Sequence, residues 1–258
     1  MDALRGGLKD QGWKIIALEL VANDLEPGFY EDFKKILKTR VRPEFLVFTK
    51  TYGTFEISGS KIKFVEFNIS DALHWIRDKL LEFRSHKIAL LIAGHGTGKG
   101  FKLWDGLELE ILSLAKYIPF KIELVILDSC MMATDITSRA FSGYAKYMIA
   151  MQDYCPWNGF ISPYLDWILT SDIEKTAKRF VDDFIFRAKL ETTDPVSASV
   201  IDLDIDIFLP NSEEISICRI DPKFKGHLDF RCQTGKIPDS VIYTRSTTKS
   251  RSGLNLVN

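Results

Sequence analysis

Residues 87–96 read KIALLIAGHG, and residues 122–130 read IELVILDSC. In both stretches an almost continuous apolar run is followed by small or polar residues. Such runs are typical of strands that are covered on both faces, as in the parallel sheets of α/β proteins. A helix expected at about residues 108–117 separates the two runs. This order of strand, helix and strand predicts a mainly parallel central sheet with helices on both faces.

A reactive side chain follows each of these two strands, His95 after the first and Cys130 after the second. The carboxyl ends of parallel strands shape a common crevice, and neighbouring strands lie only ~4.8 Å apart. A free thiol, with a pKa of about 8.5, is mostly protonated at neutral pH, and a departing amine needs a proton. An imidazole can serve both needs, so the pair is a candidate for nucleophilic catalysis. The alternative is that Cys130 is a buried structural cysteine and His95 a structural histidine in a turn. The sequence pattern alone does not decide between catalysis and this alternative.

Glycines flank the histidine on both sides. Because Gly94 and Gly96 lack a Cβ, a substrate backbone can come close to His95. The Gly96 amide is in addition a candidate donor to an oxyanion.

The same glycine cluster, residues 94–100 (GHGTGKG), resembles a phosphate-binding loop. A Walker A motif ending here needs glycine at position 93 and serine or threonine at position 100, but the sequence has Ala93 and Gly100. The dinucleotide pattern GxGxxG fails as well, because its third glycine position holds Lys99. Nucleotide binding is therefore not expected.

The remaining elements follow from hydrophobic periodicity and turn residues. Strands are expected at residues 14–20, 44–50, 147–150 and 196–208, a hairpin within 51–68, helices at 27–37 and 71–83, and a long helical stretch at 161–190 with a break at 170–172. No linker divides the chain, so one domain is expected over residues 1–245. The polar residues 246–258 are expected to form a flexible tail.

Three aspartates, Asp202, Asp204 and Asp206, alternate with apolar residues in the last expected strand. In a strand they share one face, which favours a solvated surface, with a calcium site as the alternative. Otherwise no cofactor is expected. The four cysteines form no CxxC pair and the four histidines are scattered, so neither a zinc site nor a disulfide framework is predicted.

The amino-acid composition argues against nucleic acid and membranes as partners. Of the 258 residues 46% are hydrophobic and 27% are charged, yet the formal net charge is only −1, so there is no overall field to attract nucleic acid or a membrane. The N-terminal residues do not form the apolar core of a secretion signal, and no apolar run approaches the ~20 residues that span a bilayer. We expect a cytoplasmic protein whose thiols are free.

Four ordered stretches resemble the clostripain family of cysteine peptidases, which share the caspase–hemoglobinase fold: residues 13–26 (WKIIALELVANDLE), 90–98 (LLIAGHGTG), 127–132 (LDSCMM) and 147–164 (YMIAMQDYCPWNGFISPY). The resemblance implies a caspase-like three-layer sandwich and a cysteine endopeptidase. His95 then takes the position of the catalytic histidine and Cys130 that of the nucleophile.

The resemblance also implies a pocket for a basic P1 side chain, the one before the scissile bond. Asp128 takes the position of the acid two residues before the nucleophile. Asn158 stands where the family has a second acid, so one contribution to the pocket is missing, and Asp153 is a candidate substitute. We expect cleavage after arginine or lysine with a reduced preference.

Two other functions stay open at this point. The chain could be a caspase-like pseudoenzyme or interaction module in a larger regulatory complex, or a thiol acyltransferase or amidase on a related scaffold. Retention of both His95 and Cys130 favours the peptidase. The expected partners are a protein or peptide substrate and a regulatory protein, with neither nucleic acid nor membrane.

Overall fold

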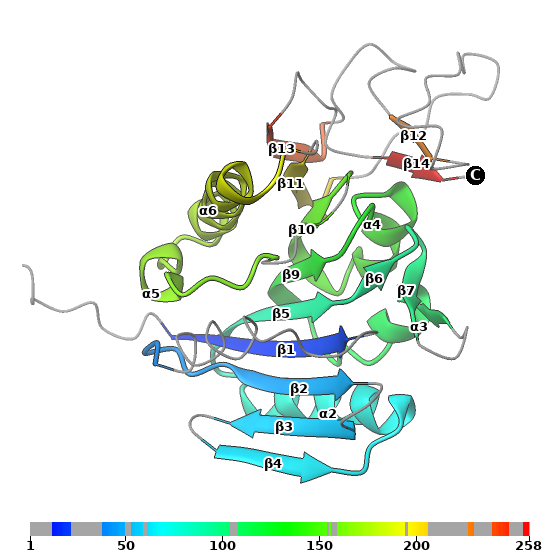
Figure 1. Ribbon diagram of the computed structural model, residues 1–258, viewed down its shortest axis with the longest axis vertical. Coiled ribbons are helices and arrows are strands. Elements are labelled where there is room, and N and C mark those ends of the chain that lie inside the picture. Colours follow the sequence, from blue (N-terminus) through cyan, green and yellow to red (C-terminus); the bar gives the residue numbers. More distant parts are fainter. Residues whose placement is uncertain are drawn as a thin grey trace, which may run out of the picture.

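The computed structural model describes residues 12–21, 38–49, 53–58, 61–103, 108–153, 155, 159–193, 196–205, 227–229, 239–247 and 255–257. A nine-stranded sheet forms the centre of this part (Figure 1). From edge to edge its strands are β13 (Val241–Ser246), β11 (Ser197–Asp202), β10 (Ala145–Met151), β9 (Ile122–Asp128), β5 (Lys87–Ala93), β1 (Trp13–Val21), β2 (Glu44–Thr49), β3 (Gly53–Ser58) and β4 (Lys61–Val65).

The five central strands, from β10 to β2, are parallel, and the two strands at each edge join in antiparallel ladders. β5 and β9 are adjacent and lie near the middle of this block, where both faces are covered by protein. This burial explains why their sequences are continuous apolar runs instead of alternating ones. The predicted α/β fold with a parallel core is confirmed, and β3 and β4 form the expected hairpin.

Helices cover both faces of the sheet, giving three layers (Figure 1). One face packs against α2 (Ile69–Glu82), α3 (Ile111–Ala115) and α4 (Asp135–Phe141). The other packs against α5 (Leu165–Ile168) and α6 (Ile173–Glu191). α2 begins at a capping box in which Asn68 and Asp71 each accept from the other's backbone N–H. α6 begins at Asp172, whose side chain accepts from the Lys175 N–H, and this confirms the predicted break.

The connection between β5 and β9 differs from the expectation. A small three-stranded sheet forms there from β6 (His95–Gly96), β7 (Gly100–Lys102) and β8 (Glu108–Glu110). It leaves α3 shorter than the helix expected at 108–117. The elements of this sheet are two or three residues long, too short for a periodic pattern to reveal them.

The three aspartates do not alternate along one strand as predicted, because β11 ends at Asp202. Asp204 lies in a turn, where its N–H donates to Asp202 Oδ1 and its carboxylate pairs with Lys121. Asp206 and the helix expected at 27–37 lie outside the described residues.

Two short strands lie apart from the central sheet. β12 (His227–Asp229) pairs with β14 (Asn255–Val257), which falls within residues 246–258. The division of the chain into a domain and a tail stays a prediction. In the described part of the chain, no helix is both long and apolar enough to cross a membrane.

Candidate active site

The two segments singled out in the sequence meet at the carboxyl ends of β5 and β9. Ala93 and Asp128 are partners in this parallel ladder, so His95 and Cys130 each stand two residues beyond the same rung. The approach is so close that a Cβ added at Gly96 would clash with the Cys130 carbonyl oxygen and with Ser129 Oγ. Glycine is therefore required at position 96 by packing, and the histidine turn rests against the cysteine turn.

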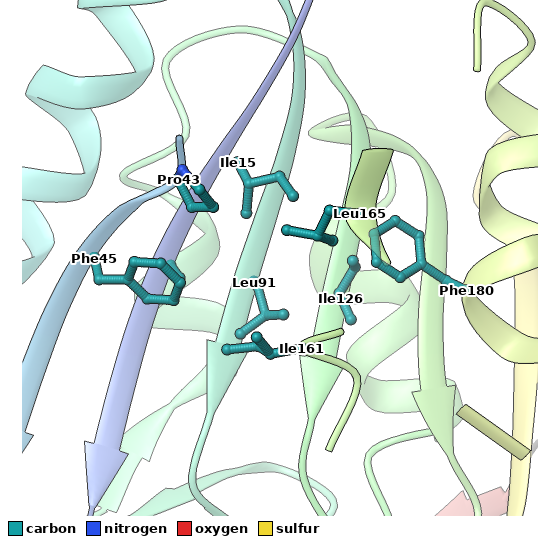
Figure 2. A pocket seen from close by; sticks show the side chains of 9 residues that line it. Ile15, Pro43, Phe45, Leu91, Ile126, Ile161, Leu165 and Phe180 are labelled. Carbon is teal, nitrogen blue, oxygen red and sulfur yellow. The ribbon is translucent and has the colours of Figure 1, made fainter. Parts of the chain in front are cut away.

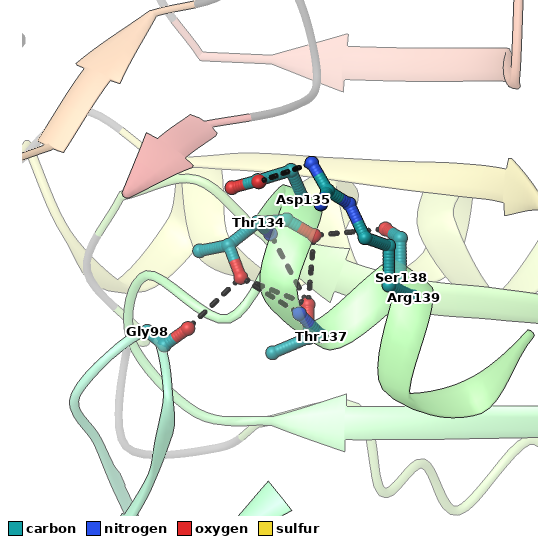
Figure 3. Close-up of polar contacts among 6 residues, drawn as sticks. All are labelled: Gly98, Thr134, Asp135, Thr137, Ser138 and Arg139. Atoms are coloured by element: carbon teal, nitrogen blue, oxygen red, sulfur yellow. Dashed lines mark hydrogen bonds and ion pairs between the residues drawn. The ribbon is translucent and has the colours of Figure 1, made fainter. Parts of the chain in front are cut away.

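Two hydrogen bonds fasten the histidine turn on either side of His95. The Ser129 hydroxyl donates to the Gly94 carbonyl at 2.5 Å, and the Thr134 hydroxyl donates to the Gly98 carbonyl at 2.9 Å (Figure 3). Both hydroxyl-bearing residues are fully buried. Sequence reasoning missed them, although each lies within four residues of Cys130.

Thr134 has a second role, because it is the N-cap of α4. Its side chain accepts from the Thr137 N–H, and the Thr137 hydroxyl accepts from the Thr134 N–H (Figure 3). One residue thus fixes both the start of the helix that follows the cysteine turn and the glycine turn that carries His95. The motif Thr-x-x-Thr could have signalled the helix start, but not the contact with Gly98.

The Cys130 thiol is half-buried beneath the segment that contains Cys155. The Cys155 backbone N–H points at Cys130 Sγ at 3.2 Å. Burial raises the pKa of the Cys130 thiol, whereas the Cys155 N–H opposes this rise because it stabilises the thiolate. In this conformation burial thus favours the neutral thiol over the thiolate. Met131, the next residue, has a left-handed backbone (φ 58°) and donates its N–H to the Asp153 carbonyl at 3.0 Å.

His95 lies at the open rim of the site, with an exposed side chain. Its strand, β6, pairs with β7 through the rung of His95 and Lys102. Within the described residues, no hydrogen bond joins the His95 ring to Cys130. Catalytic hydrogen bonds are often long or unformed before substrate binds, so this geometry is compatible with an acid acting on the leaving group.

Asp128 lies beneath the cysteine turn and is only 6% exposed. Its Oδ2 accepts from the Phe160 N–H at 2.7 Å, and its Oδ1 accepts from the Cys155 thiol at 3.2 Å. Burial raises the pKa of this carboxyl group, while these hydrogen bonds and the Arg187 guanidinium oppose the rise. Gly159, whose φ is 44°, lies so close that an added Cβ would clash with both carboxylate oxygens.

The other two predicted pocket residues are placed differently. The Asp153 carboxylate is buried and accepts from the Ser197 hydroxyl of β11 at 2.8 Å, so it is engaged by a strand of the central sheet. Asn158 lies outside the described residues. The structure thus brings His95, Gly96, Cys130 and Asp128 together, while the Asp153 side chain is bound elsewhere.

Glu19 is the titratable group at this edge that the sequence analysis missed. It is 6% exposed and pairs in the ladder with Ala93, the residue that pairs with Asp128 on the other side. Burial, and secondarily the negative charge of Asp128, raise the pKa of Glu19 to about 8. Its presence as the one acid within the run KIIALEL was the available signal.

Replacing Glu19 by glutamine should change how stability depends on pH. The Glu19 carboxyl is harder to ionise in the folded chain (pKa about 8) than in the unfolded chain (about 4.5), so the folded state holds the extra proton between these values. The free energy of unfolding should fall with rising pH by up to about 1.4 kcal/mol per unit in this window. Glu19→Gln should flatten this slope in urea titrations between pH 5 and 8. An unchanged slope would contradict the burial of an ionisable Glu19.

No metal site accompanies these residues. Among the described side chains, no group of three or more His, Cys, Asp or Glu could hold a metal ion. The calcium interpretation of Asp202, Asp204 and Asp206 stays a prediction.

The chain resembles several solved cysteine proteases in fold. A secreted C11 cysteine protease from Bacteroides thetaiotaomicron, "iotapain", matches with a TM-score of 0.69 and 16% identity over 95% of this chain and 93% of that one. A secreted C11 protease from the same organism, in complex with an irreversible peptide inhibitor, matches with a TM-score of 0.72 and 14% identity over 96% and 92%. An inactive zymogen C11 protease from Parabacteroides distasonis matches with a TM-score of 0.66 and 17% identity over 95% and 91%.

These comparisons establish the class of fold. It is the caspase-like fold of the C11, or clostripain-type, cysteine proteases, and the resemblance found in the sequence is confirmed at that level. No protein-family model matches the chain, and no curated protein sequence matches it.

Proposed function

We propose that the protein is a cysteine endopeptidase with Cys130 as nucleophile and His95 as acid–base partner. The observation that carries the proposal is the contact of the two turns, in which Gly96 lies against Cys130 at the ends of adjacent parallel strands. The shared fold with C11 proteases over about 95% of the chain supports the same activity.

The reaction follows from the chemistry of these groups. The Cys130 thiol gives its proton to solvent, the thiolate attacks the carbonyl carbon of the scissile peptide bond, and the developing oxyanion lies near the Gly96 N–H. Collapse of this intermediate breaks the C–N bond as His95 gives a proton to the departing amine. Water then attacks the thioacyl group, losing a proton to the imidazole, and releases the new carboxylate and the free thiol.

The burial of the Cys130 thiol limits the access of a substrate to the nucleophile. Because Cys130 is half-buried and its Sγ faces the Cys155 N–H, the carbonyl of a substrate would have to displace Cys155 from the thiol. Such a movement would lower the desolvation that raises the thiol pKa, so substrate binding and activation of the nucleophile are coupled in this proposal.

A panel of fluorogenic peptides with varied P1 residues tests the activity. Hydrolysis that Cys130→Ala removes supports the peptidase. A complete absence of hydrolysis and of thioacyl transfer would favour the pseudoenzyme, and acyl transfer to an added amine without hydrolysis would favour the acyltransferase. The proposed substrates are peptides or proteins, and the regulatory partner and the cytoplasmic location stay predictions.

We further propose cleavage after arginine or lysine, with Asp128 as an acid of the P1 pocket. A charge-assisted hydrogen bond is worth roughly 1.5–3 kcal/mol, or about 10- to 150-fold in rate. Asp128→Asn should therefore remove most of the preference for arginine over a neutral residue of similar size. It should also lower stability by about 1–3 kcal/mol, because an amide NH₂ in place of Oδ2 would oppose the Phe160 N–H.

A positional scanning library measures this preference, and chemical denaturation measures the stability. The amide could instead flip to present its oxygen to Phe160, in which case the stability loss shrinks but the loss of charge remains. A dominant preference of the wild-type protein for aspartate at P1 would overturn the basic specificity.

A further inference from the structure

We propose that Glu19 is a second acidic residue of the P1 pocket, acting with Asp128 on the cationic head of an arginine or lysine side chain. This inference rests on the proposed peptidase function and extends it to Glu19, a residue of the first matching stretch to which the sequence analysis assigned no role.

The ladder puts the two acids on one face, on either side of a small residue. Glu19 pairs with Ala93, and Ala93 pairs with Asp128. Partners in a parallel ladder project to the same face, and two strand spacings separate Glu19 from Asp128 by about 9.6 Å at Cα. Ala93 fills little of the space between them, so a planar guanidinium above Ala93 could reach a carboxyl group on each side.

One oxygen of Glu19 has no partner of its own. Glu19 Oε2 is buried and accepts no hydrogen bond from the described residues. An unsatisfied buried oxygen is costly, and such groups usually have a role that fills them. A donor that arrives with the substrate would satisfy it, because a guanidinium carries five N–H groups and an ammonium three.

The charges near Glu19 and Asp128 are not fully balanced by a cation of the protein. The nearest guanidinium that acts on Asp128 is Arg187 of α6, whose Nε is already paired with Asp183 at 2.8 Å and whose Nη2 donates to the Gly159 carbonyl at 2.9 Å. Arg187 is thus shared between Asp183 and Asp128, and Asp128 is the charged group that acts on Glu19. An incoming cation would allow both Glu19 and Asp128 to ionise.

Directly below this row lies a small apolar cavity (Figure 2). It is lined by Ala17, Leu91 and Ile126, each two residues before Glu19, Ala93 and Asp128 on the same faces of their strands, and is closed by Ile161 and Leu165 among others. The acids therefore lie between the cysteine turn and an apolar floor. The cavity is no larger than about one water molecule, so it offers no room for a side chain beyond the acids, and a cationic head would stop at them.

The test compares two peptides that are identical except for arginine or citrulline at P1, since citrulline has nearly the same shape without the charge. The variants are Glu19→Gln and, as matched control, Glu44→Gln. Glu44 is similarly buried and also has an oxygen without a hydrogen bond, but it forms ion pairs with Lys14 and Lys79 and begins β2 at the opposite end of the strands. It therefore controls for the loss of a buried carboxylate away from the site. Glu19→Gln should lower the arginine-to-citrulline ratio of kcat/KM about 10-fold or more while citrulline cleavage stays the same. Glu44→Gln should leave the ratio unchanged.

Agmatine, a free guanidinium compound, gives a readout that needs no hydrolysis. It should bind the wild-type protein in calorimetry, and Glu19→Gln should weaken binding about 10-fold. If Glu19→Gln does not fold, Glu19→Met, which matches the apolar neighbours in β1, replaces it. An unchanged ratio with unchanged agmatine affinity, or a preference for norleucine over arginine, would overturn the role of Glu19. Agmatine binding that depends on Glu19, without cleavage of any peptide, would count against the peptidase and not against the pocket.

Discussion

Cys130→Ala should abolish peptide hydrolysis while leaving the fold intact. The substitution removes one sulfur atom at a half-buried turn, so it costs little packing, but it removes the proposed nucleophile. A loss of more than 10³-fold in kcat is the usual scale for a missing nucleophile. Fluorogenic peptide assays with purified variants measure the loss, and circular dichroism checks the fold.

Cys155→Ala is the matched control for this experiment. Cys155 contacts Cys130 through its backbone N–H, which alanine retains, and contacts Asp128 through its thiol, which alanine lacks. We expect kcat within a fewfold of wild type. Cys130→Ala activity within tenfold of wild type, with contaminating protease excluded, would contradict the mechanism, and selective loss in Cys155→Ala would move the nucleophile there.

His95→Ala should lower kcat by ~10²-fold or more, the usual scale for a positioned acid–base group. The imidazole is exposed and makes no described hydrogen bond to Cys130, so in the proposed mechanism its main task is to protonate the leaving amine. Iodoacetamide should accordingly alkylate Cys130 at a similar rate in His95→Ala and in wild type.

This pair of measurements separates two roles of the histidine. If alkylation of Cys130 slows in proportion to kcat, His95 ionises the thiol in the resting enzyme. If kcat stays near the wild-type value, His95 is not the acid. Lys102, its partner across β6 and β7, is a suitable neighbouring control, because Lys102→Ala should leave kcat almost unchanged.

The parallel core could be predicted because burial on both faces imposes a one-dimensional pattern. The runs at β5 and β9 indicated strands, and the order of elements indicated their direction. His95 and Cys130 then fell at the same edge without any knowledge of side-chain positions. The small β6, β7 and β8 sheet escaped prediction because strands of two or three residues carry no period.

The supporting residues of the site could not be predicted for a different reason. Ser129 and Thr134 act through hydrogen bonds to the carbonyls of Gly94 and Gly98, which are about 35 residues away in sequence. The presence of a serine or threonine does not indicate which distant carbonyl its hydroxyl will contact. Glu19 becomes conspicuous only when the ladder aligns it with Asp128.

The expected use of Asp153 depended on how its loop folds. The Met131 N–H holds the backbone carbonyl of Asp153 and the Ser197 hydroxyl holds its carboxylate, so the acid that could have replaced Asn158 is bound to strand β11 of the sheet. Such tertiary hydrogen bonds, and not the local sequence pattern, set the conformation of a loop. For this reason the role of Asp153 in the pocket could not be predicted from the sequence.

The most direct test of the central claim is covalent labelling of the nucleophile. The protein is incubated with a peptide acyloxymethyl ketone that carries arginine at P1, and the modified residue is located by mass spectrometry of the digested chain. The account predicts one adduct, on Cys130, that excess peptide substrate prevents and that Cys130→Ala abolishes. An adduct on Cys155 in the wild-type protein, or labelling of Cys130 that substrate does not prevent, would contradict it.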